Sequence, residues 1–161
     1  RRILNLSNKY DFFSFSQTKT NWSWQEILYG MENKIIARSD VINYATRILD
    51  EGILGFDWVL KIAIADEYED ILPYIYELGN LEDSEDDSTI QDKWRYFILK
   101  ELYAKKSNYE NFNEKVEEIY ADFDYPEDMA GFIGYMPSLD GKSMEESWQE
   151  YLTSSKGEFE N

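Results

Sequence analysis

The sequence predicts an all-α protein, a single domain of about eight short helices in an antiparallel array. Apolar residues recur mainly at spacings of three and four, which is the period of a helix that buries one face. Only three prolines and eight glycines occur among the 161 residues, so few positions break a helix. Residues 23–26, 88–91 and 143–146 have the Ser-x-x-Glu or Ser-x-x-Gln spacing of a capping box, which marks the first turn of a helix.

The first 22 residues have no clear helical period and predict an irregular N-terminal arm, residues 1–22. They are rich in Ser, Thr, Asn, Phe and Lys, and Phe12, Phe13 and Phe15 can form a short strand or pack as an extended segment. The helical domain is expected over residues 23–153. Short loops between its helices would make sequential helices neighbours.

Caps and breakers place the helices of the first half. Ser23 opens the first helix, Ser39 caps the second and Gly52 stops it. Pro73 fits the first turn of a later helix, because an N–H at that position has no helical partner. Gly79 lies where a C-terminal glycine is expected. The two helices expected after Gly52 cover about residues 57–65 and 70–78.

The second half predicts four more helices. Their expected starts are Ser88, residue 111, Pro126 and Ser143. Small residues at Gly131 and Gly134 favour close approach of a neighbouring backbone in the core. Residues 154–161 predict a frayed tail after the last helix.

The charge of the chain excludes two classes of function. The sequence has 33 acidic and 16 basic side chains, a formal net charge of −17 and a pI near 4.3. A surface this acidic repels phosphate backbones and anionic lipid headgroups, so we expect neither nucleic acid nor membrane as a partner. No apolar run approaches the length of a membrane span, and no signal-peptide core follows the first residues, which predicts a cytoplasmic protein.

The sequence contains no cysteine and no histidine. These absences exclude zinc fingers, iron–sulfur clusters, disulfides, thiol nucleophiles and Ser-His-Asp triads. Catalysis would have to use carboxylates, Lys, Tyr, Ser or Thr, and among 33 carboxylates no pair is distinguished. We therefore expect no catalytic residues, no metal and no cofactor.

Five carboxylates lie close together at residues 82–87, a segment that we call the acidic loop. They are Glu82, Asp83, Glu85, Asp86 and Asp87. The segment lacks the Asp-x-Asp-x-Asp-Gly spacing and the closing Glu of an EF-hand calcium loop. Two interpretations stay open, a solvated mobile loop and an electrostatic docking patch for a basic partner.

Carboxylates and aromatic rings alternate along residues 120–129. The candidate partner-binding residues here are Asp122, Phe123, Asp124, Tyr125, Glu127 and Asp128. The acids and the proline suit the first turn of a helix, and rigid rings surrounded by charge are also typical of interface anchors. Residues 1–80 hold 12 acidic and 8 basic side chains, net −4, whereas residues 81–161 hold 21 and 8, net −13. A basic protein is therefore expected to dock on the second half.

Several segments occur in the order found in a known family. They are Trp24-Gln-Glu-Ile-Leu-Tyr-Gly30, residues 39–45, residues 62–66, Lys93-Trp94, Ile119-Tyr-Ala-Asp-Phe-Asp-Tyr-Pro-Glu127 and Tyr135-Met-Pro137. Over about residues 20–155 the chain resembles a small bacterial family known only as a domain of unknown function. Its setting is similar to that of immunity proteins of bacterial toxin systems. The resemblance implies no catalytic residues.

These observations favour an acidic binding protein that neutralises a cognate toxin in a stoichiometric complex. Many antibacterial toxins are nucleases with basic surfaces, because they must hold phosphates, and an acidic inhibitor is attracted to such a surface. Two alternatives stay open. One is a carboxylate-based or metal-dependent enzyme, suggested by the carboxylate density at residues 122–128, and the other is a helical adaptor with no toxin partner.

Overall fold

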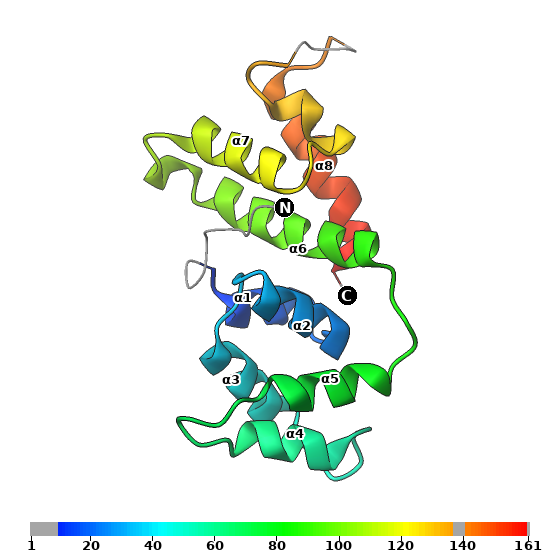
Figure 1. Cartoon of the computed structure of the whole chain (residues 1–161). Helices are drawn as coiled ribbons and strands as arrows, with labels where there is room; N and C mark the ends of the chain where they lie inside the picture. Colours follow the sequence, from blue (N-terminus) through cyan, green and yellow to red (C-terminus); the bar gives the residue numbers. More distant parts are fainter. Residues whose placement is uncertain (1–9, 137–140, 161) are drawn as a thin grey trace. The chain divides into compact units, whose positions relative to one another are not determined.

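The computed structural model describes residues 10–136 and 141–160, and over these residues every regular element is helical (Figure 1). The all-α prediction is confirmed. The α-helices are α1 (Phe12–Thr18), α2 (Trp24–Glu32), α3 (Arg38–Ile48), α4 (Phe56–Ala63), α5 (Leu72–Asn80), α6 (Asp87–Ala104), α7 (Phe112–Asp122) and α8 (Met144–Phe159). Two 3-10 helices, η1 (Lys106–Asn108) and η2 (Glu127–Phe132), complete the described elements.

Contacts among the described residues form two compact units. The N-terminal unit ends at Ile90, within the first turns of α6, and the C-terminal unit begins at Gln91. In the N-terminal unit α2 packs on α5, α3 packs on α4, and α4 also contacts α5 (Figure 1). These helices are short and amphipathic, so they are held by the apolar faces that they share. That core contains Ile27, Val41, Ala45, Val59, Ile62, Ile75 and Leu78, all fully buried.

Residues 12–18 form a helix instead of the expected short strand or extended arm. The Asp11 side chain caps α1 by accepting a hydrogen bond from the Ser14 N–H at 3.2 Å. Phe12 and Phe15, three positions apart, share the buried face of the helix, while Phe13 is 53% exposed. The prediction of an irregular arm missed this helix because seven residues give too short a pattern to show a period.

Two of the four expected serine caps are confirmed and two are corrected. Ser23 and Ser143 each form the complete capping box that their sequences predict. α3 begins one residue before Ser39, since the Asp40 carboxylate accepts a hydrogen bond from the Ala37 N–H at 2.8 Å. α6 begins before Ser88, and its first i to i−4 bond runs from Ile90 to the Asp86 carbonyl at 3.1 Å. In α3, the Asp40 carboxylate therefore satisfies an amide at the helix start where we expected a serine cap.

In the C-terminal unit η2 packs against α8. The Phe132 ring stacks on Trp148 with centroids 4.1 Å apart. A Cβ at Gly131 would lie 2.6 Å from the Ser147 hydroxyl, so only glycine permits this approach. The neighbour at Gly131 is thus a side chain of α8, and Gly131 and Gly134 are both exposed, so the expected approach of a backbone in the core is not observed. The element that follows Pro126 is a 3-10 helix of six residues, where an α-helix was expected.

Residues 154–159 continue α8 and Glu160 is its C-cap, so the expected frayed tail is wrong for residues 154–160. Phe159 is buried, with its ring 5.9 Å from that of Tyr96. Glu160 forms an ion pair with Lys100 at 2.6 Å and accepts a hydrogen bond from the Tyr96 hydroxyl. These contacts join residues that are far apart in the sequence, so the pattern of neighbouring residues could not predict them. Residue 161 lies outside the described residues.

We predict that Phe159→Ala lowers the free energy of unfolding by roughly 2–4 kcal/mol, since it removes a buried ring and leaves a cavity. The control is Glu158→Ala, which truncates the exposed neighbour and should change stability by less than about 0.5 kcal/mol. Urea denaturation measures both. Equal effects of the two changes would show that the end of α8 is not packed.

Glu160 makes stability depend on pH. Burial opposes its charge, but the hydrogen bonds from Lys100 and Tyr96 outweigh burial, and its pKa lies below the usual value. A lowered pKa in the folded state gives stability that is present above the unfolded pKa and is lost as the pH falls through the folded pKa. We therefore expect the stability difference between the native chain and Glu160→Gln to shrink between pH 7 and pH 3. Urea denaturation at both pH values measures it, and a constant difference would contradict this assignment.

Candidate interaction surface

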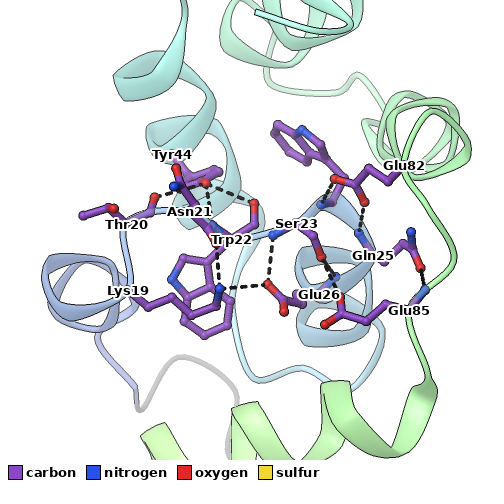
Figure 2. A network of polar contacts seen from close by, with 11 residues as sticks. Lys19, Thr20, Asn21, Trp22, Ser23, Gln25, Glu26, Tyr44, Glu82 and Glu85 are labelled. Atoms are coloured by element: carbon purple, nitrogen blue, oxygen red, sulfur yellow. Dashed lines mark hydrogen bonds and ion pairs between the residues drawn. The ribbon is translucent and has the colours of Figure 1, made fainter. Parts of the chain in front are cut away.

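The acidic loop caps the start of α2 (Figure 2). The Glu82 carboxylate accepts hydrogen bonds from the Trp24 N–H at 2.8 Å and from the Gln25 N–H at 3.1 Å. Both amides belong to the first turn of α2, where no helical carbonyl is available to them. The negative charge also lies at the positive end of the helix dipole. Glu82 therefore supplements the Ser23 cap from a position almost 60 residues away.

The other residues of the acidic loop are held by the same helix end. The Ser23 hydroxyl donates to the Glu85 carboxylate at 3.2 Å, and the Glu85 N–H donates to the Gln25 side-chain oxygen at 2.9 Å. The Gln25 side-chain amide in turn donates to the Asp83 carbonyl at 2.8 Å (Figure 2). These bonds tie the backbone of the loop to the start of α2 at Asp83 and Glu85. The side chains of Asp83, Asp86 and Asp87 remain exposed.

A buried carboxylate lies next to this cap. Glu26 accepts a hydrogen bond from the Ser23 N–H at 2.8 Å and lies 3.5 Å from the Lys19 ammonium group (Figure 2). Lys19 also lies over the Trp22 ring, 5.3 Å from its centroid. The Tyr44 hydroxyl accepts from the Trp22 N–H at 3.0 Å, and burial raises the pKa of that hydroxyl. These hydrogen bonds and the contact with Lys19 link α1, α2 and α3.

The structure divides the candidate residues of the second segment into buried and exposed groups. Asp122 and Phe123, at the end of α7, are buried and so are not presented to a partner. Asp128 forms a two-pronged ion pair with the buried Arg95, at 2.7 and 3.1 Å. Burial opposes the Arg95 charge, but the Asp128 bonds outweigh burial and raise the pKa of the guanidinium. Asp124, Tyr125 and Glu127 are exposed.

Three tyrosines gather at the end of α7, and we call them the tyrosine cluster. The Tyr120 ring lies 5.2 Å from Tyr125, nearly perpendicular to it, and 6.4 Å from Tyr135. Tyr120 is buried, whereas Tyr125 is 59% and Tyr135 is 61% exposed. Two large rings therefore face solvent on a buried aromatic support. Tyr135 was not among the expected contact residues, because its sequence neighbours suggested core packing.

An unusual backbone turn presents Tyr125. Asp124 and Tyr125 both have left-handed φ values, 62° and 56°. The Tyr125 N–H donates to the Tyr120 carbonyl at 2.8 Å, which closes the end of α7. A non-glycine residue in this region costs about 1–3 kcal/mol and often marks a functional position. The turn directs an exposed tyrosine outward where a glycine would have been less strained.

Carboxylates surround the tyrosine cluster. Asp124 and Glu127 are exposed beside Tyr125 in the chain. The Glu117 carboxylate reaches the loop that carries Tyr135, 3.9 Å from where a Cβ at Gly134 would be. Partial desolvation, the neighbouring tyrosines and Glu117 together raise the pKa of Tyr135. The rings and the acids together form a negative, partly aromatic surface.

A family described as an uncharacterized protein conserved in bacteria (DUF2247) matches residues 12–156. The chain belongs to this family. The matched residues include both the acidic loop and the tyrosine cluster. No curated protein and no solved structure matches the chain.

Two further properties bear on function. Within residues 10–136 and 141–160, no group of three or more acidic side chains is arranged to hold a metal ion. None of the helices described for this family member is both long and apolar enough to cross a membrane. The carboxylates of the acidic loop are instead engaged with backbone amides or face solvent separately.

We predict that Glu82→Ala lowers the free energy of unfolding by about 1–2 kcal/mol, because two amides of α2 lose their acceptor. Asp83→Ala is the matched control. Its backbone carbonyl still accepts from Gln25, so we expect a change below about 0.5 kcal/mol. Urea denaturation followed by circular dichroism measures both, and an equal effect of the two substitutions would show that the loop is held by charge alone.

Proposed function

We propose that this chain is an acidic binding protein that neutralises a basic bacterial toxin in a stoichiometric complex in the cytoplasm. The observation that carries the proposal is the tyrosine cluster, where two exposed rings on a buried support are surrounded by carboxylates. Exposed tyrosines held rigidly are typical interface anchors, because they bury a large area and lose little conformational freedom. An inhibitor that acts by occlusion needs no catalytic residues.

The charge distribution supports a basic partner. Residues 81–161 carry a net charge of −13, and this total includes the exposed acids of the acidic loop. Such a field accelerates encounter with a cationic protein and repels anionic ones. A nuclease-type toxin has the required surface, because its substrate is a polyanion.

Co-expression tests the proposal. Immunity genes stand next to toxin genes, so the product of the gene adjacent to this one is the natural candidate. We expect that product to stop growth of a bacterial host when expressed alone and to be harmless when this chain is co-expressed. Size-exclusion chromatography with light scattering should then show a complex of fixed stoichiometry. A product that is harmless alone, or equally toxic in the presence of this chain, would contradict the proposal.

The proposal predicts different kinetic roles for the two surfaces. Changing Asp83, Asp86 and Asp87 together to Asn should slow association about tenfold at low salt and leave dissociation nearly unchanged, since these exposed acids act at long range. Tyr125→Ala should instead speed dissociation about tenfold. Stopped-flow mixing with the purified partner measures both constants. High salt should remove the first effect and preserve the second, and the reverse assignment of rates would contradict this scheme.

A further inference from the structure

Cations packed over aromatic rings are a repeated contact in this chain. Arg47 lies over Phe13 and Lys61 over Trp58, each 4.9 Å from the ring centroid. Lys19, Arg95 and Lys106 make similar contacts with other rings. The face of an aromatic ring carries negative charge density, so a cation gains energy there, most when water is excluded.

The tyrosine cluster lacks such a cation within the part of the chain that the structure describes. None of the cation–ring contacts in that part involves Tyr125 or Tyr135. Partial desolvation and the negative charge of Glu117 both raise the pKa of Tyr135. The rings and carboxylates thus offer what a cation requires, and none of the residues in 10–136 and 141–160 places a cation over the two exposed rings. A cation of another molecule would fit this position.

The backbone at Asp124 and Tyr125 shows that this exposure is maintained against a cost. Both residues adopt left-handed φ values that non-glycine residues rarely occupy. The Tyr125 ring still contacts Tyr120 edge to face, so its position is defined. A rigid ring loses little freedom on binding, which favours its use as a preformed docking position.

We propose that the tyrosine cluster receives an arginine side chain of the basic partner, an inference that rests on the proposed function. A guanidinium is planar and weakly hydrated, so it can stack on an exposed tyrosine face and donate two hydrogen bonds to a carboxylate at the same time. Asp124, Glu127 and Glu117 provide carboxylates beside the exposed rings. A lysine ammonium cannot make both contacts with one planar group, so the site distinguishes the two cations.

A blocked hexa-arginine peptide is the probe, and hexalysine is the comparison. At low salt we expect hexa-arginine to shift the ring resonances of Tyr125 and Tyr135 in NMR spectra of the tyrosine-labelled protein. Isothermal titration of the double variant Tyr125→Leu, Tyr135→Leu should give a dissociation constant about tenfold weaker than that of the native chain. The double variant to Phe keeps the rings and should bind within about twofold of native.

Tyr68→Leu is the matched control, because Tyr68 is 91% exposed and lies outside the cluster in the N-terminal unit. It should leave hexa-arginine binding unchanged. The inference is overturned if the double Leu variant binds within twofold of native, or if hexalysine binds as tightly and shifts the same resonances. Either result would mean attraction by net charge alone. The ring shifts of the native protein decide the matter even if the Leu variant folds poorly.

Failure of this inference can be separated from failure of the proposed function. Arginine binding at the cluster without neutralisation of a toxin would leave the site standing and remove the function. Neutralisation that persists in the double Leu variant, with unchanged affinity for the partner, would leave the function standing and place the anchor elsewhere.

Discussion

A carboxylate that leaves water needs a hydrogen-bond donor, and this chain has 33 acidic side chains for 16 basic ones. Many acids therefore need a donor other than a cation, or must stay in solvent. Glu82 and Asp40 use backbone amides at helix starts, and Glu26 combines an amide with Lys19. Asp128 and Glu160 take cations from α6. The acids that remain outside these arrangements form the surface on which the functional proposal rests.

The pairing of acids with amides, cations or solvent also explains why two acidic segments of similar composition differ in role. The acidic loop lies against the start of α2, where free amides are concentrated, and its backbone is fixed by those contacts. The segment after α7 reverses direction through Asp124 and Tyr125, and this reversal turns one tyrosine and one carboxylate outward. The two segments have similar charge, but they differ in the hydrogen bonds that hold their backbones.

The helix boundaries that were predicted correctly depend on residues close in the sequence. Helix boundaries that depend on contacts with distant residues were missed. The Ser23 and Ser143 caps are local, and both were predicted correctly. The cap of α3 was expected at Ser39 but lies two residues earlier at Ala37, whose N–H donates to the Asp40 carboxylate. The end of α8 was missed because Phe159 is held by Tyr96, more than 60 residues earlier. A helix as short as α1 is stable only when its buried face packs against a partner, so its sequence pattern alone does not predict it.

The candidate surface shows the same limit. Alternating acids and rings at residues 120–129 indicated a recognition segment, but the pattern could not separate buried Phe123 from exposed Tyr125. A left-handed turn sets that difference, and nothing in the residue types of Asp124 and Tyr125 demands it. Tyr135 joins the cluster through a contact with Tyr120 that is not local in sequence.

We propose that the surface around the tyrosine cluster, more than the acidic loop, contacts the partner. Hydrogen–deuterium exchange of the chain alone and in complex with the product of the adjacent gene distinguishes the two surfaces. We expect strong new protection over residues 117–136 and little change at residues 82–87, where the Glu82 and Glu85 amides are already hydrogen-bonded in the free chain. Protection confined to residues 10–90, with residues 117–136 exchanging as in the free chain, would contradict it.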